Sequence, residues 1–338
     1  MIGTAMIDCH PPTVKRSQLV PPDAASDSIA ASPEDPIFHQ PWWLDAVSPG
    51  RWDAVTVERG GRVVARLPFT VRGPRSFRVL TQPPLTPFLG PWIAPEAGAK
   101  YARALSDQME LQARLEAGLP PAAAFHQSFA STTASALPFI WAGYRAELRY
   151  TYRLEDLSSE AALWDGLAGN IRREIRKARR RLRVCEGEDL DRFHAVWAKT
   201  FQRQGKAAPD RNGLARLDTA CRQRGARTML FAYDDADRVH AVAYVVRDRC
   251  TAYYLMGGGD PQLRTSGASS LLLWEAIRRT RQVVPVFDFE GSMLAPVERF
   301  FRAFGGRQAP YLRVSRANRA AVAALAVRAG AQRLLRRH

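Results

Sequence analysis

The sequence has 338 residues, and its hydrophobic fraction of 46% is sufficient for a buried core. At roughly 100–200 residues per domain, this length predicts two domains or one large duplicated unit. The 49 Lys and Arg against 33 Asp and Glu give a net charge of +16, which attracts polyanions, although codon bias towards arginine in a GC-rich genome explains it equally well. The composition excludes a membrane-spanning helix, since no apolar run reaches 18 residues, and a zinc site, since Cys9, Cys185, Cys221 and Cys250 lack ligand spacing.

The first 36 residues are rich in Pro, Ser, Ala and Asp, and they predict a disordered leader without a signal peptide. Ordered structure is expected from Phe38, with a short helix at 41–44. Two strands at 52–59 and 62–71 flank Gly60-Gly61, a hairpin signal. Further strands are expected at 77–81, 88–93, 122–129 and 144–154, with one helix at about 98–117. Residues 37–156 thus predict an α/β domain.

The second half, 157–316, predicts a helix capped by Ser158 or Ser159 and then a segment with apolar positions at helical spacing. The expected order continues with helices at 189–204 and 213–224 and a three-stranded meander at 228–233, 239–248 and 251–256. Gly257-Gly258-Gly259 is expected to end the third strand. The remaining prediction is a helix at 269–281, a strand at 284–290, a helix at 296–304 and a strand at 311–315. A basic helix is expected at 317–338.

The segment from Tyr253 to Arg279 predicts an anion site. Its small residues allow the backbone to approach a bulky ligand. The first N–H groups of the following helix have no partners within the helix and favour phosphate. Arg264 adds a positive charge, and a glycine-rich turn with a plain helix cap is the alternative. The expected donor-binding residues are Met256, Gly257, Gly258, Arg264, Gly267, Ala268 and Ser269.

A second candidate site is Val286-Phe287-Asp288-Phe289-Glu290. Alternation in a strand directs Asp288 and Glu290 to one face and both phenylalanines to the core. Two carboxylates beside apolar surface raise the pKa of one of them, which then accepts a proton from an ammonium group. Glu290, at the end of the strand, is the preferred base. The alternative is that the pair binds Arg299 or Arg302 structurally.

These two motifs resemble the FemAB-like, BioF2-like (acetyltransferase 6) group of the GNAT acyltransferases. Arg264-Thr265-Ser266-Gly267-Ala268-Ser269 is similar to the acyl-CoA pyrophosphate loop, with Ser269 in place of the last small residue. Asp288-Phe289-Glu290-Gly291-Ser292, then Phe300-Phe301-Arg302-Ala303-Phe304-Gly305-Gly306 and Pro310-Tyr311, resemble the C-terminal signature. The resemblance implies two tandem GNAT-like domains of mixed sheets flanked by helices.

The resemblance also implies the activity and further site residues. The expected reaction is transfer of an acyl group from acyl-CoA to an amine, in a bacterial envelope or polysaccharide pathway, without a metal. Aminoacyl-tRNA-dependent peptidyl transfer and a non-catalytic envelope scaffold are the alternatives. Tyr311 joins the catalytic residues, and the expected substrate-binding residues are Gln82, Thr86, Arg173, Lys177 and Ser292.

The partner and location follow from the same reasoning. The acceptor is expected to be a small-molecule or peptidoglycan-precursor amine. The basic run at 172–183 has eight cations and one anion, and it is either a phosphate-binding surface or a solvated helix face. The C-terminal helix either binds an anionic membrane or docks on its own domain. The sequence predicts a cytoplasmic protein, with the inner-membrane surface as the alternative location.

Overall fold

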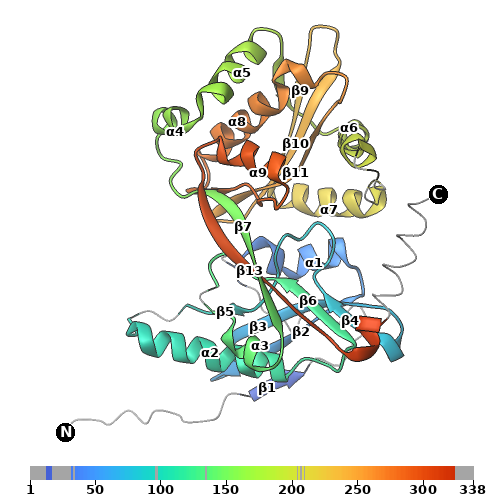
Figure 1. Cartoon of the computed structure of the whole chain (residues 1–338), viewed down its shortest axis with the longest axis vertical. Helices are drawn as coiled ribbons and strands as arrows, with labels where there is room; N and C mark the ends of the chain where they lie inside the picture. The colour runs from blue at the N-terminus through green and yellow to red at the C-terminus, as the bar shows by residue number, and fades with distance from the viewer. Residues whose placement is uncertain are drawn as a thin grey trace. The chain divides into compact units, whose positions relative to one another are not determined.

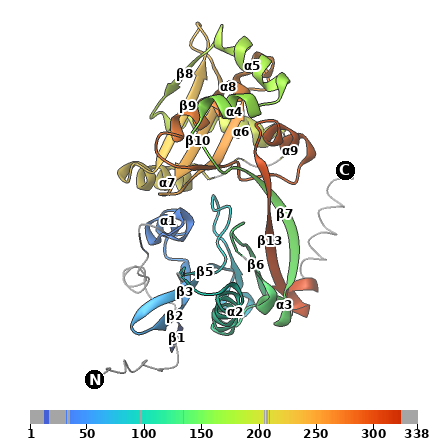
Figure 2. The same cartoon turned by 90° about the vertical axis from the view of Figure 1, so that its left-hand side faces the viewer.

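The computed structural model describes residues 13–16, 32, 35–95, 98–133, 135–203, 205, 208 and 210–323. It forms two compact units. Unit 1 comprises Met1–Ala31, Ser48–Leu148 and Tyr311–His338, and unit 2 comprises Ser32–Val47 and Arg149–Pro310. The chain passes between them on strands β7 (Arg145–Leu154) and β13 (Arg307–Ala317) (Figures 1 and 2). The predicted boundaries differ from this division, because the segment at 37–47 belongs to unit 2 and the end of β13 belongs to unit 1.

Unit 1 is a mixed sheet with helices α2 (Tyr101–Ala117) and α3 (Leu137–Trp141). Strand order is β1, β2, β3, β4, β6 and the end of β13, and β5 pairs with β3. The predicted hairpin is confirmed, since Gly60 and Gly61 both have positive φ between paired strands. The strands of this unit other than β13 are β1 (Thr13–Arg16), β2 (Trp52–Arg59), β3 (Arg62–Arg72), β4 (Val79–Thr81), β5 (Trp92–Ile93) and β6 (Ala124–Ser128).

The sheet of unit 2 runs β7, β12, β11, β10, β9, β8. The predicted meander is confirmed, because β9, β10 and β11 pair antiparallel in sequence order. Strand β12 then joins β11 in parallel, through a crossover that contains helix α8. The bounds are β8 (Arg183–Glu186), β9 (Arg227–Tyr233), β10 (Val239–Arg247), β11 (Thr251–Gly259) and β12 (Val286–Asp288).

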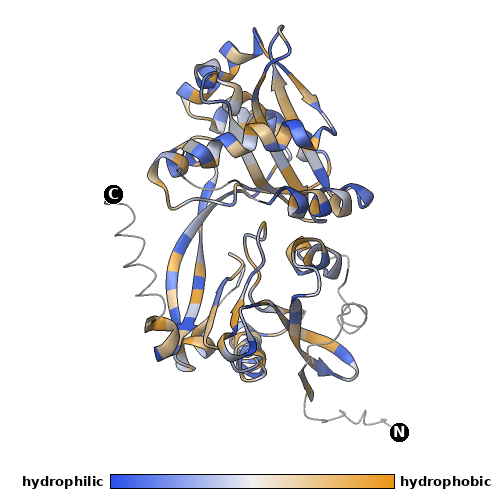
Figure 3. Cartoon of the chain, turned by 90° about the vertical axis from the view of Figure 1, so that its right-hand side faces the viewer, coloured by the Kyte–Doolittle hydropathy of each residue, from blue (hydrophilic) through white to orange (hydrophobic). Residues whose placement is uncertain are grey.

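Helices cover both faces of this sheet. Figure 1 shows α5 and α8 on one side of β9–β11 and α6 on the other. Side chains of β10 alternate between the two faces of the sheet, which explains why helices pack on both. Ala243 and Val245 join the core beneath α8. The ring of Tyr244 points the other way and lies 5.7 Å from Phe193 of α6. Figure 3 shows the hydrophobic colour concentrated on these strands. The helices of unit 2 are α1 (Pro41–Val47), α4 (Glu160–Gly166), α5 (Gly169–Arg179), α6 (Leu190–Arg203), α7 (Arg211–Gln223), α8 (Ala268–Thr280) and α9 (Ala295–Arg302).

Several segments differ from the sequence prediction, whereas the start of the expected C-terminal helix is confirmed. Residues 13–16 of the expected leader form β1, because they pair with β2; most other leader residues lie outside the described part. Gly257, Gly258 and Gly259 extend β11 instead of ending it, since all three pair with β10. The sequence did not predict the short elements α3 and β8. Residues 319–323 of the expected C-terminal helix are helical, and 324–338 lie outside the described residues.

Candidate active site

The predicted donor loop lies between β11 and α8. After β11, a 3-10 turn at Arg264–Ser266 leads to Gly267, which caps α8 with φ of 77°. A Cβ on Gly267 would lie 2.9 Å from the carbonyl oxygen of Glu174 in α5. This position therefore requires glycine for two reasons, the left-handed backbone and the close approach of α5.

The start of α8 has unpaired N–H groups. The N–H of Ala268 donates to Oγ of Ser266 at 3.3 Å, while those of Ser269 and Ser270 have no acceptor among the residues that the structure describes. Arg264 is exposed at the same end. A helix start with free donors and a nearby guanidinium attracts a phosphate, so the predicted geometry of this loop is present.

Helix α5 brings a cationic face to this loop. The ammonium group of Lys177 donates to the carbonyl oxygen of Thr265 at 3.3 Å. Arg173, Arg176 and Arg180 are exposed and share that helix face at i, i+3 and i+7 spacing. We call these four residues, Arg173, Arg176, Lys177 and Arg180, the α5 basic stripe. The opposite face of α5 is buried through Ile171, Ile175 and Ala178.

Three of the predicted donor-binding residues have structural reasons for their identity. A Cβ on Gly258 would lie 2.5 Å from Oγ1 of Thr200 in α6, and one on Gly257 would clash with the hydroxyl of Tyr254. Met256 is buried, with 4% exposure. The small residues of β11 therefore admit protein neighbours, and a role in donor binding stays a prediction.

Strands β11 and β12 pair over a short distance only. Three register pairs join them, ending at Tyr253 and Asp288. One step further, the pairing of β11 with β10 shifts between Tyr254 and Met256, which leaves Leu255 as a bulge. From Tyr254 onwards β11 has no pairing partner on the β12 side in the described residues, because β12 ends at Asp288.

The two predicted carboxylates come together at this point, although not by strand alternation. Strand β12 ends at Asp288, and Glu290 has a left-handed backbone with φ of 61°. Its N–H donates to Oδ1 of Asp288 at 2.8 Å. Phe287 and Phe289 are fully buried with ring centroids 5.1 Å apart, as predicted. The correction concerns Glu290 alone, which is placed by a tight turn beyond the strand.

The environment of the pair raises both carboxyl pKa values. Burial, and then the charge of Asp288, raise the pKa of Glu290 well above its usual value. Burial likewise raises the pKa of Asp288, although the hydroxyl of Thr151 donates to its Oδ1 at 2.5 Å. Oε1 of Glu290 is buried without a hydrogen-bond partner in the described part of the chain. An unpartnered buried carboxyl oxygen with a raised pKa is typical of a proton acceptor.

The arginine beside the pair differs from the prediction. Nε of Arg153, in β7, lies 3.9 Å from Oδ2 of Asp288. Arg302 pairs instead with Glu298 at 3.0 Å, one helical turn before it. Nothing in the sequence pointed to Arg153, because it is brought next to Asp288 only by the pairing of β7 with β12.

The structure adds Tyr253 to the candidate site. It stands opposite Asp288 in the register of β11 and β12. Its hydroxyl donates to Oδ2 of Asp248 at 3.1 Å, and its pKa is raised by burial and then by the charges of Asp248, Asp288 and Glu290. The sequence placed Tyr253 in the third strand of the meander, but only the register of β11 and β12 shows that it lies opposite Asp288.

The structure gives local contacts for most of the other predicted residues. The amide of Gln82 donates to the carbonyl oxygens of Thr86 and Pro87 and accepts from the N–H of Ser128, so it shapes its own loop in unit 1. The hydroxyl of Thr86 donates to the carbonyl oxygen of Pro84. Ser292 accepts from the N–H of Leu294 before α9, and Tyr311 belongs to unit 1. Their catalytic or substrate-binding roles stay predictions.

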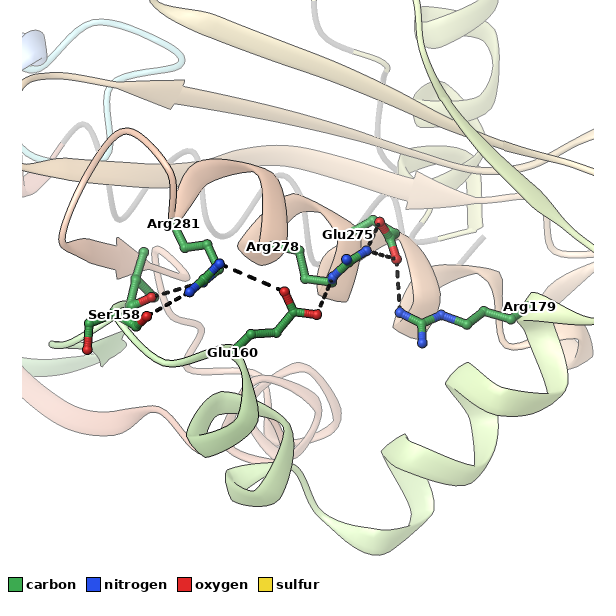
Figure 4. A network of polar contacts seen from close by, with 7 residues as sticks. Ser158, Glu160, Arg179, Glu275, Arg278 and Arg281 are labelled. Carbon is green, nitrogen blue, oxygen red and sulfur yellow. Dashed lines mark hydrogen bonds and ion pairs between the residues drawn. The ribbon is translucent and has the colours of Figure 1, made fainter.

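An ion-pair network fixes α8 beneath the donor loop (Figure 4). Glu275 of α8 pairs with Arg179 of α5 at 3.1 Å and with Arg278 at 3.0 Å. Arg278 also reaches Glu160 at the start of α4, at 2.7 Å. Three helices are thus tied together on one side of the sheet, which positions α5 against the start of α8.

Metal-binding clusters and membrane-spanning helices are both missing from the described part of the chain. No group of three or more His, Cys, Asp or Glu side chains is arranged to hold a metal ion within those residues. None of the described helices combines the length and apolarity that crossing a bilayer requires.

Comparison with known proteins agrees with the fold described above. Residues 167–302 match the model of the acetyltransferase (GNAT) domain. Among solved structures, FemX has a TM-score of 0.61 at 11% identity, covering 89% of this chain and 96% of its own. A conserved protein of unknown function from Bacteroides thetaiotaomicron has a TM-score of 0.51 at 11% identity, covering 90% and 99%. No curated protein matches the sequence.

Residues 167–302 thus form an acetyltransferase (GNAT) domain, which makes the protein an acyltransferase by class, and the predicted α/β fold class is confirmed. The fold of the whole chain is similar to that of FemX.

Proposed function

We propose that the protein transfers an acyl group from acyl-CoA to an amine, with Glu290 as the general base. The carrying observation is the buried Oε1 of Glu290, which has no hydrogen-bond partner in the described residues and lies two residues beyond the last pair of β11 with β12. In the proposed step, Glu290 accepts a proton from the ammonium group of the acceptor. The nitrogen lone pair forms a C–N bond to the thioester carbon, the C–S bond breaks, and the thiolate takes the second nitrogen proton.

The neighbours of Glu290 support this role. Asp288 accepts hydrogen bonds from Thr151 and from the N–H of Glu290, so it fixes the turn that carries the base. Its negative charge raises the proton affinity of Glu290. Arg153 offsets part of that charge. We assign Asp288 and Arg153 as positioning residues, and Tyr311 stays a proposed catalytic residue.

The donor is proposed to bind along Arg264 and the start of α8. The free N–H groups of Ser269 and Ser270 supply hydrogen bonds to phosphate oxygens, and Lys177 adds charge from α5. Arg173, Gln82, Thr86 and Ser292 are proposed to contact substrate. This assignment requires no metal.

Calorimetry with acetyl-CoA tests the donor site. Wild type is expected to bind, and Arg264→Ala to bind several-fold more weakly, because one charge-assisted contact is lost. Gly267→Trp should abolish binding, with circular dichroism used to confirm folding. Arg222→Ala is the matched control, since Arg222 is exposed and lies on α7. Absence of heat with any acyl-CoA would exclude this donor.

A second candidate is the aminoacyl-tRNA-dependent reaction. The α5 basic stripe favours it, because Lys177 links that row of exposed cations to the donor loop. Binding of RNA would depend steeply on salt, in proportion to the number of phosphates contacted. A charged tRNA that binds with such a slope, together with no affinity for acyl-CoA, would favour this candidate.

The acceptor and location belong to the same proposal. We propose a small-molecule or peptidoglycan-precursor amine as acceptor, and a cytoplasmic location with peripheral binding to anionic membrane. Co-sedimentation with anionic and neutral vesicles tests the membrane part, and equal binding to both would argue against it.

A further inference from the structure

A cavity of about 510 Å³ lies in unit 2, away from the donor loop and the carboxylate pair. It is formed by the segment before α1, by α1 itself, by the residues after α7, and by the turn between β10 and β11. Its charged lining residues are Asp35, Arg224, Arg247, Asp248 and Arg249. The volume is within the range of about 300–1,000 Å³ that small-molecule sites occupy.

Two of the three arginines that line this cavity, Arg247 and Arg224, have no carboxylate partner in the described residues. The guanidinium of Arg247 has no ion-pair or hydrogen-bond partner within the described part of the chain, and the side chain is half-buried. The guanidinium of Arg224 lies 4.7 Å from the ring of Trp42 and donates only to the carbonyl oxygen of Ala220. Neither arginine has a carboxylate partner among those residues, so both guanidinium groups keep donors for a ligand.

One of the two lining carboxylates, Asp248, already accepts four hydrogen bonds. Oδ1 of Asp248 accepts the N–H groups of Cys250 and Thr251 at 2.9 and 2.8 Å. Its Oδ2 accepts the N–H of Ile37 at 3.3 Å and the hydroxyl of Tyr253 at 3.1 Å. Asp248 therefore fixes the cavity wall, because its lone pairs serve the backbone and Tyr253. Asp35 and Asp248 offset two of the three arginine charges, so the lining keeps a net charge of +1.

We propose that this cavity binds a small anionic molecule, whose phosphate or carboxylate group pairs with Arg247 and Arg224 beside the ring of Trp42. Guanidinium groups bind both anions through paired N–H donors. No lining residue belongs to the donor loop or to the carboxylate pair, and the one link to the candidate active site that is described is the hydrogen bond from Tyr253 to Asp248.

Calorimetry on the full chain tests the proposal, with inorganic pyrophosphate and citrate titrated separately. At least one is expected to bind, and the stronger one distinguishes a phosphate from a carboxylate ligand. Arg247→Ala should weaken that binding by about tenfold or more, which is the scale of one charge-assisted hydrogen bond. Arg247→Lys should lose less, since it keeps the charge. Arg222→Ala is the control and should leave the affinity unchanged.

Two further variants locate the bound anion. Arg264→Ala separates this cavity from the donor loop, and it should leave the affinity of the cavity unchanged. Trp42→Phe should remove the change in tryptophan fluorescence that accompanies binding. Binding that is lost in Arg264→Ala but kept in Arg247→Ala, no binding of either anion, or preferential binding of a cation such as spermidine would each overturn the proposal.

Discussion

The turn that carries Glu290 depends on the residue after it, so Gly291→Ala provides a direct test of the site. Gly291 has φ of 58°, and a Cβ there would lie 2.2 Å from the carbonyl oxygen of Tyr150 and 2.6 Å from Cα of Thr151. Both neighbours are backbone atoms of β7, which cannot rotate away as a flexible side chain would. The hydroxyl of Thr151 is also the donor to Asp288.

Two costs add at this position. The left-handed backbone costs an alanine roughly 1–2 kcal/mol. Overpacking against rigid neighbours costs about 1–3 kcal/mol more. The free energy of unfolding should therefore fall by roughly 2–5 kcal/mol. At about 2–4 °C per kcal/mol for a domain of this size class, Tm should fall by about 4–20 °C.

Gly225→Ala isolates the first of these costs. Gly225 has φ of 57° at the end of α7, and nothing lies within 4 Å of the place that a Cβ would occupy. The free energy of unfolding of this variant should fall by roughly 1–2 kcal/mol, because only the left-handed backbone is unfavourable for alanine. Thermal and urea unfolding of both variants give the comparison. Equal losses in the two variants would refute the close packing of β7 against the Glu290 turn.

The substitution Glu290→Gln should stabilise the protein more strongly as pH rises. The pKa of Glu290 is raised in the folded state. The stability that the protonated carboxyl contributes in wild type is therefore complete below pH 4.5 and is lost as pH rises through the pKa of the folded state. Urea unfolding of both proteins from about pH 5 to 8 checks this, and a constant difference would contradict it. Asp218→Ala should cost roughly 3–5 kcal/mol, because it removes a carboxylate 3.0 Å from the buried Arg227; Asp191→Ala, at an exposed ion pair, should cost less than about 1 kcal/mol. Lys177→Ala should weaken acetyl-CoA binding several-fold in calorimetry, with a smaller loss at high salt, and an unchanged affinity would remove α5 from the donor site.

Local signals in the sequence were sufficient for most elements of unit 2. Ser159 was expected to cap a helix, and its Oγ accepts the N–H of Ala162 at the start of α4. Gly305-Gly306 was recognised as part of a signature, and the structure explains both residues. A Cβ on Gly305 would lie 2.7 Å from the carbonyl oxygen of Gly166, and one on Gly306 would lie 3.1 Å from the ring of Phe289. Capping and steric requirements of this kind are carried by single residues, so sequence reveals them.

Contacts between distant strands were not predictable in this way. Thr151 and Arg153 surround Asp288 because β7 pairs with β12, although Thr151 and Asp288 are 137 residues apart in the sequence. The glycines of β11 were expected to break the strand, since glycine is unfavourable in strands. They pair with β10 instead. Gly257 and Gly258 are glycine because the hydroxyl of Tyr254 and Thr200 of α6 occupy the space that their side chains would need. Strand register and tertiary packing determine the neighbours of such residues, and neither can be predicted from local sequence.

The turn at Glu290 combines a strained backbone with an incompletely paired carboxylate. A non-glycine residue at φ of 61° costs free energy, and burial of a carboxyl oxygen without a hydrogen bond costs more. A turn selected for stability alone would have glycine or asparagine here, either of which tolerates this backbone. The surrounding contacts hold the turn in place: Asp288 accepts its N–H, and β7 packs against Gly291. These contacts stabilise an otherwise unfavourable residue, which is what the proposed role of Glu290 as general base requires.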